Sequence, residues 1–149
     1  MQFPKQAFLR VFTDLKALDQ VLDWFDQLDL LPMPKQDWIL CKLALAEGFT
    51  NAVNHAHKNL ASEVPIEIEL TLQPTDLKIC IWDWGEPFDL DAYIANLDYI
   101  SQQQELGSGR GVAILWKIAD HLSYNRTEDN RNCLLIVRNY SPVQVNYDY

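Results

Sequence analysis

The chain has 149 residues, of which 12 are basic and 21 acidic, giving a formal net charge of −9. This acidity disfavours nonspecific binding to nucleic acid, whose phosphates would repel the chain. The sequence contains no apolar run of about 18 residues, the length that a membrane-spanning helix needs. Length and hydrophobic content predict one globular domain over residues 1–149, with residues 142–149 as a tail. The N-terminal residues lack an apolar secretory segment, so we expect a cytoplasmic protein without membrane contact.

The first third of the chain predicts one strand and two helices. Residues 7–12 form a short apolar run that is typical of an edge strand. Apolar residues then recur at helical spacing over residues 14–28, and the prolines at positions 32 and 34 end this helix. Pro34 suits the first turn of a longer second helix, which should fade near Asn59.

The rest of the chain predicts a sheet with one exposed face. Residues 65–72 alternate strictly between apolar and polar, and residues 77–83 return after a turn, which indicates a hairpin. Four further segments predict a short helix over 90–99, a helix within 112–122, and a pair of strands over 121–126 and 132–140. The predicted fold class is an α+β two-layer sandwich, in which a mixed, mostly antiparallel sheet carries its helices on one face.

The three cysteines predict reduced thiols rather than a disulfide framework. They are odd in number, far apart, and each stands in an apolar context. We therefore expect all three to be buried: Cys41, Cys80 and Cys133.

Polar residues line one face of the long helix. At about 100° per residue, Glu47, Asn51 and Asn54 lie within about 60° of one another, opposite an apolar face. Asparagine is a weak helix former because its side chain competes for backbone hydrogen bonds. Two asparagines beside a carboxylate therefore indicate a binding site on this face.

Glycines concentrate in two loops. Of five glycines, four stand at Gly85, Gly107, Gly109 and Gly111. The second loop directly precedes an apolar helix, so its backbone N–H groups and the helix N-terminus can face an anion. The alternative interpretation is a turn and a simple connector.

Three motifs occur in the order of a known family. They are Glu47-x-x-x-Asn51-x-x-Asn54-His55-Ala56, Asp83-x-Gly85-x-Pro87-Phe88 and Gly107-x-Gly109-x-Gly111. The chain resembles the GHKL (histidine-kinase-like) ATPases over nearly its whole length, and most of all their anti-sigma-factor serine/threonine kinase branch. The resemblance implies the Bergerat, or histidine-kinase-like, ATPase fold.

The resemblance also implies the roles of individual residues. Glu47 would be catalytic and would orient or deprotonate the acceptor hydroxyl, while Asn51 would hold Mg2+. Asp83 would accept a hydrogen bond from the adenine amino group. Arg110 could meet either a phosphate or a partner carboxylate. The implied ATP-binding residues are Asn51, Asn54, Asp83, Gly85, Gly107, Gly109, Arg110, Gly111 and Val112.

The implied function is an ATP- and Mg2+-dependent serine/threonine kinase. Its substrate would be an anti-anti-sigma protein with a STAS domain, and a sigma factor would compete with that protein for binding to the kinase. The family often forms homodimers. Two alternatives stay open. One is a partner-switching module that binds ATP without transferring phosphate, and the other is a helix–sheet interaction module that binds no nucleotide.

The chain also departs from the family pattern. Glu86-Pro87 stands where the family often has a small residue, and Asn132-Cys133 stands where Gly-Thr or Asn-Thr is common, which puts a contact near adenine in doubt. Neither nearby histidine is expected to accept phosphate. We expect His55 to make a structural hydrogen bond at the helix end and His57 to be exposed.

Overall fold

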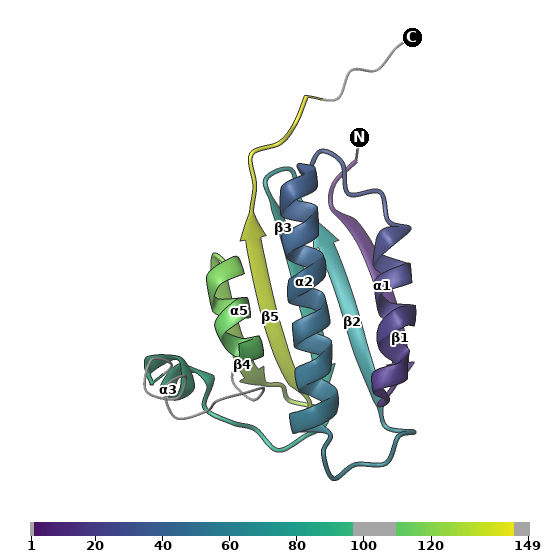
Figure 1. Cartoon of the computed structure of the whole chain (residues 1–149), viewed down its shortest axis with the longest axis vertical. Helices are drawn as coiled ribbons and strands as arrows, with labels where there is room; N and C mark the ends of the chain where they lie inside the picture. Colours follow the sequence, from purple (N-terminus) through teal and green to yellow (C-terminus); the bar gives the residue numbers. More distant parts are fainter. Residues whose placement is uncertain (1, 97–109, 145–149) are drawn as a thin grey trace.

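The computed structural model describes residues 2–96 and 110–144 (Figure 1). Five strands form one sheet in the order β1-β2-β3-β5-β4, and every neighbouring pair is antiparallel. The strands are β1 (Lys5–Phe12), β2 (Pro65–Leu72), β3 (Asp76–Asp83), β4 (His121–Arg126) and β5 (Asn132–Asn139). The helices are η1 (Leu15–Ala17), α1 (Leu18–Asp26), α2 (Lys35–Asn51), η2 (Ala52–Ala56), α3 (Leu90–Ala95) and α5 (Arg110–Ile118).

The helices cover one face of the sheet, as the sequence predicted. Figure 1 shows α1, α2 and α5 side by side in front of the strands, with α2 along the middle. In β2, Ile66, Ile68, Leu70 and Leu72 are buried beneath this layer, while the residues between them are half-buried. This alternation sorts the side chains of the sheet between a core and an open face. The predicted α+β two-layer fold is therefore confirmed.

The end of α5 differs from the prediction. The expected helix within 112–122 stops at Ile118, because Asp120 turns the chain into β4. The Asp120 amide donates to the Val137 carbonyl at 2.8 Å, and its carboxylate accepts from the Asn139 amide at 2.7 Å. Leu122 consequently reaches the core from a strand and not from a helix. The expected loop over 100–106, the end of the expected 90–99 helix and most of the expected tail lie outside the described residues.

The cysteines divide into one buried and two half-buried thiols. Cys41 is 1% exposed, and burial raises its pKa to about 12. Cys80 and Cys133 are half-buried on neighbouring strands, so the expectation that all three are buried was wrong for these two. Both occupy half-buried positions that alternate with the buried residues of β3 and β5, so both thiols lie on the open face of the sheet. A hydrogen bond from Cys133 lowers the pKa of Cys80.

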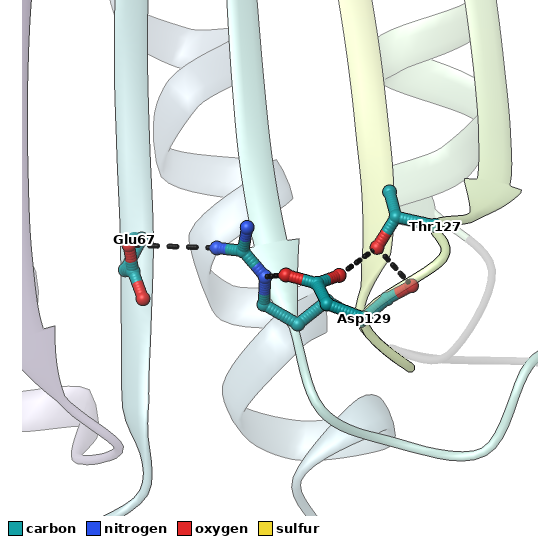
Figure 2. A network of polar contacts seen from close by, with 4 residues as sticks. Glu67, Thr127 and Asp129 are labelled. Atoms are coloured by element: carbon teal, nitrogen blue, oxygen red, sulfur yellow. Dashed lines mark hydrogen bonds and ion pairs between the residues drawn. The ribbon is translucent and has the colours of Figure 1, made fainter.

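A polar network fixes the turn between β4 and β5. The guanidinium of Arg131 contacts both Asp129 of the turn and Glu67 of β2. Figure 2 shows this network, with Glu67, Thr127 and Asp129 labelled. The Arg131 Nε donates to Asp129 at 2.7 Å, and the ion pair with Glu67 spans 3.5 Å. The same guanidinium lies over the rings of Trp82 and Trp84, 5.4 and 5.9 Å from their centroids. These contacts position the start of β5, where the candidate site begins.

Among the helices in residues 2–96 and 110–144, none is long and apolar enough to cross a membrane.

Candidate functional site

A cavity of about 440 Å3 lies between the helical layer and the sheet. Its walls come from α2 and η2, the ends of β3 and β5, the first turns of α3 and α5, and β4. Most of the lining is apolar, and it includes Ile81, Leu115 and Leu134. This volume falls in the range of small-molecule sites, which are commonly apolar clefts with a few placed polar groups.

Two glycines let the walls approach one another closely. A Cβ on Gly48 of α2 would lie 2.5 Å from the Ile81 Cδ1 of the sheet. A Cβ on Gly85 would lie 2.1 Å from the Ala56 carbonyl oxygen, at the end of η2. The segment after β3 is therefore packed directly on the backbone of the helix end, which fixes where β3 delivers its last residue, Asp83.

Asp83 forms one end of the cavity and is 3% exposed. Its Oδ1 accepts from the Gly85 amide at 2.9 Å and from the Asn132 side-chain amide at 2.8 Å. Its Oδ2 accepts from the Tyr124 hydroxyl at 2.8 Å. A carboxylate oxygen can accept two hydrogen bonds, so Oδ1 is saturated and Oδ2 retains one position. Asp83 can thus accept a hydrogen bond from an amino group in the cavity.

The Tyr124 hydroxyl keeps its proton at this end of the cavity. Burial and the neighbouring Asp83 carboxylate both raise the pKa of Tyr124 far above its ordinary value of 10.0. The hydroxyl therefore acts as a donor to Asp83 throughout the physiological pH range. Nothing in the sequence pattern around Tyr124 indicated this role, because it depends on β4 lying beside β5.

Asn132 is the second contact that the motifs did not predict. It is fully buried, and its Nδ2 donates both to Asp83 and, at 2.8 Å, to the Gly85 carbonyl. These two acceptors fix the orientation of the amide. Its Oδ1 is buried without a hydrogen-bond partner in the described part of the chain. Cys133, which stands where the family commonly has threonine, faces the opposite side of the sheet.

The alternation of side chains along β5 could have predicted that Asn132 faces the site. Leu134 and Ile136 are both buried on the helical side, and Asn132 has the same parity. Successive side chains of a strand point to opposite faces, so the residue at the site is Asn132.

Glu47 and Asn51 meet the start of α5. They lie one helical turn apart on α2, and Gly111 packs against both. A Cβ on Gly111 would lie 2.9 Å from the Glu47 Oε2 and 3.1 Å from the Asn51 Oδ1. The first turn of a helix carries N–H groups without intrahelical partners, which favour an anion. A carboxylate, a carboxamide and a helix N-terminus therefore meet at one point.

The family comparison agrees with this arrangement. The family model described as "Histidine kinase-like ATPase domain" matches residues 12–138. The chain belongs to the histidine kinase-like ATPase domain family. It is thus an ATP-binding domain of the GHKL type. A comparison with curated proteins found no match.

The cavity fits the nucleotide of a histidine kinase-like ATPase domain. Asp83 has one free acceptor position of the kind that an adenine amino group requires, and apolar side chains line the space beside it. No group of three or more His, Cys, Asp or Glu side chains suited to a metal occurs in residues 2–96 and 110–144. Mg2+ bound with a nucleotide uses few protein ligands and keeps phosphate oxygens and waters, so a single carboxamide such as Asn51 is compatible with it.

An aromatic wall adds to the predicted site. Phe88 and Tyr124 both line the cavity with ring centroids 4.8 Å apart, and Tyr93 meets Phe88 edge-on at 6.5 Å. Such faces can pack against a planar base. Phe88 stands in the predicted Asp-x-Gly motif, but Tyr93 and Tyr124 come from other elements, so sequence spacing did not bring them together.

Only some of the predicted ATP-binding residues line the cavity. Asn51, Asp83 and Val112 line the cavity. Gly85 and Gly111 are not among the lining residues, but they pack against two residues that are, Ala56 and Asn51. Gly107 and Gly109 lie outside the described residues, as does the side chain of Arg110.

Asn54 is exposed and is not among the residues that line the cavity. The reason is a π-helical turn from Ala52 to Ala56, in which the His57 amide donates to the Ala52 carbonyl at 2.8 Å. The wider turn changes the angle between successive residues, so Asn54 no longer follows the line of Glu47 and Asn51.

The environments of the two histidines are the reverse of those expected, since it is His57 that makes structural hydrogen bonds at the helix end. His55 is exposed and contacts the cavity, whereas His57 is 2% exposed. The prediction of an exposed His57 was therefore wrong, and the same π-helical turn explains it.

Proposed function

We propose that this protein is an anti-sigma-factor-type serine/threonine kinase. It would use ATP to phosphorylate an anti-anti-sigma protein with a STAS domain, and a sigma factor would compete for binding. The observation that supports this proposal is the meeting of Glu47 and Asn51 at Gly111, together with the cavity that Asn51 and Asp83 both line. A carboxylate at the phosphate end is what phosphoryl transfer to a hydroxyl requires.

Each residue has a separate part in the proposed reaction. Asp83 accepts from the adenine amino group and orients the nucleotide. Glu47 accepts the proton of the partner's hydroxyl as that oxygen bonds to the γ-phosphorus and the bond to ADP breaks. Asn51 would hold Mg2+, which neutralises phosphate charge when bound. The first turn of α5 supplies backbone N–H groups toward the phosphates.

The test is phosphotransfer to defined partners. The purified protein is incubated with γ-labelled ATP and Mg2+ and with individual STAS-domain proteins, and phosphoserine or phosphothreonine is measured on the partner. Label on a partner hydroxyl supports the kinase. ATP-dependent binding of a partner without any label would instead support a partner-switching module, and absence of nucleotide binding would reject both.

Asp83→Asn should weaken ATP binding by about 10- to 100-fold. The new amide nitrogen cannot occupy the Oδ1 position, because two donors already point there, from Gly85 and Asn132. It must take the Oδ2 position, where it presents hydrogens to the adenine amino group. Calorimetric titration with Mg-ATP measures the change.

Asp91→Asn is the matched control for this prediction, since it makes the same charge change at an exposed position of α3. It should bind ATP as the wild type does. Equal affinities for wild type and a folded Asp83→Asn variant would place the base elsewhere.

A further inference from the structure

His57 joins three segments behind the base end of the cavity. Its Nε2 lies 2.7 Å from the backbone nitrogen of Trp84, which donates to it. Its Nδ1 lies 2.7 Å from the hydroxyl of Thr13, in the connection after β1. The Thr13 hydroxyl in turn donates to the carbonyl of Val64, just before β2. A 2% exposed ring thus connects the helix end to β1, β2 and β3.

These contacts determine the state of the ring. The Trp84 amide can only donate, so Nε2 must carry a lone pair. The Thr13 hydroxyl uses its own proton for Val64, so Nδ1 carries the hydrogen and donates to the Thr13 oxygen. Neutral His57 with its proton on Nδ1 satisfies every partner, whereas a second proton on Nε2 would face the Trp84 N–H.

Trp84 stands between the two residues that form the base end. Asp83 precedes it, and Gly85, which follows it, donates to the Asp83 Oδ1 at 2.9 Å. Gly85 also packs on the carbonyl of Ala56, the residue before His57. The conformation of residues 83–85 therefore depends on the helix end through two adjacent contacts, and His57 supplies the only hydrogen bond to Trp84 among the side-chain bonds of the described residues.

We propose that His57 is a positioning residue of the nucleotide site, whose neutral ring holds the Trp84 amide and keeps residues 83–85 in the base-binding conformation. Protonation of a residue that does not line the cavity then weakens nucleotide binding. This inference rests on the proposed binding of adenine at Asp83.

The charges around His57 give the direction of the pH dependence. Asp83, from β3, is the charged group that acts on the ring, and its carboxylate favours the protonated form. Burial acts more strongly in the opposite direction and lowers the pKa of His57 below its ordinary value of 6.5. Thr13 and the Val64 carbonyl, from the other two segments, are uncharged. The Trp84 contact is therefore complete above pH 6.5 and is lost as pH falls through the lowered pKa.

Side-chain NMR of the wild type tests the proposal without a mutation. The chain has three histidines, and His121, which is exposed and outside the cavity lining, is an internal reference in the same spectrum. Binding and protonation are reciprocal, so a ligand that prefers neutral His57 must lower its pKa. Saturating Mg-ATP should shift the His57 titration midpoint down by about 1 pH unit, which corresponds to about tenfold coupling. An unchanged midpoint for His57 with bound ATP would overturn the proposal.

Paired variants provide the second test. His57→Gln keeps an acceptor for Trp84 but cannot titrate, whereas His57→Leu keeps neither property. Mg-ATP affinity at pH 7.5 should fall by about tenfold in His57→Leu and by less than about threefold in His57→Gln. Between pH 5 and 7.5, His57→Gln should lose a part of the pH dependence that His121→Gln, at an exposed position outside the cavity lining, retains. Protonation of ATP itself cancels in this comparison.

The possible results separate the two proposals. If His57→Gln follows the wild-type pH profile, His57 has no such role although ATP still binds. If none of the variants nor the wild type binds ATP, the proposed nucleotide site itself fails. Should both His57 variants fail to fold, the wild-type NMR titration alone decides.

Discussion

Glu47→Gln is expected to reduce phosphotransfer to the partner by roughly 10²–10⁴-fold, the usual contribution of a positioned general base. Glutamine keeps the shape of the side chain and its contact with the start of α5, but it cannot take the proton of the attacking hydroxyl. Mg-ATP affinity should stay within about threefold of the wild type, because Glu47 is expected to act on the transferred group and not on the base. Single-turnover transfer and calorimetric titration measure these two quantities separately.

Glu63→Gln is the control for this experiment, because Glu63 is an exposed carboxylate outside the cavity. Both rate and affinity should be unchanged in this variant. A Glu47→Gln variant that transfers phosphate at the wild-type rate would show that the carboxylate has no catalytic role. A large loss of ATP affinity in the same variant would show that Glu47 binds the nucleotide instead.

Gly85→Ala is expected to abolish measurable ATP binding and to lower the free energy of unfolding by about 2–3 kcal/mol. The added Cβ would lie 2.1 Å from the Ala56 carbonyl oxygen and 2.7 Å from its carbon. Because both are backbone atoms, no rotamer change relieves the overlap, and the segment after β3 must move away from the helix end. This movement would carry Asp83 and the amide that supports it out of position.

Gly48→Ala is the matched control, because its added Cβ would meet the Ile81 Cδ1 at 2.5 Å, the far end of a flexible side chain. Alanine also favours the helix by about 1 kcal/mol, which offsets part of the cost. We expect Gly48→Ala to lose less stability than Gly85→Ala in urea unfolding and to retain ATP binding. Equal behaviour of the two variants would mean that the Gly85 contact does not control the site.

The sheet and its order along the chain were predictable because their signals are local. Strict alternation in residues 65–72 gave the bounds of β2, and the turn after it gave the hairpin. Glu47 and Asn51 were likewise placed correctly relative to one another, since one α-helical turn separates them. The helical rotation of about 100° per residue holds between these two residues, because α2 is a regular α-helix up to Asn51.

The remaining details depended on features without a local signal. The π-helical turn after Asn51 changes the phase of the helix, and this one irregularity exposed Asn54 and exchanged the environments of His55 and His57. Tyr124 reaches Asp83 only because β5 lies between β3 and β4 in the sheet, a pairing between segments distant in sequence. Asn132 could have been predicted from strand parity, but the motif comparison directed attention to the neighbouring cysteine.

The position of β1 in the sheet has a consequence for the order in which a newly made chain can fold. β1 is synthesised first, yet its partner is β2, with Phe12 opposite Pro65 and Lys5 opposite Leu72. On the ribosome, β1 must remain without its partner strand until residue 72 has emerged, whereas β2 and β3 can close as a hairpin at once. The exposed aromatic side chains of Phe8 and Phe12 are then accessible during elongation. A chaperone that binds short apolar strands would meet this segment before any other strand of the sheet.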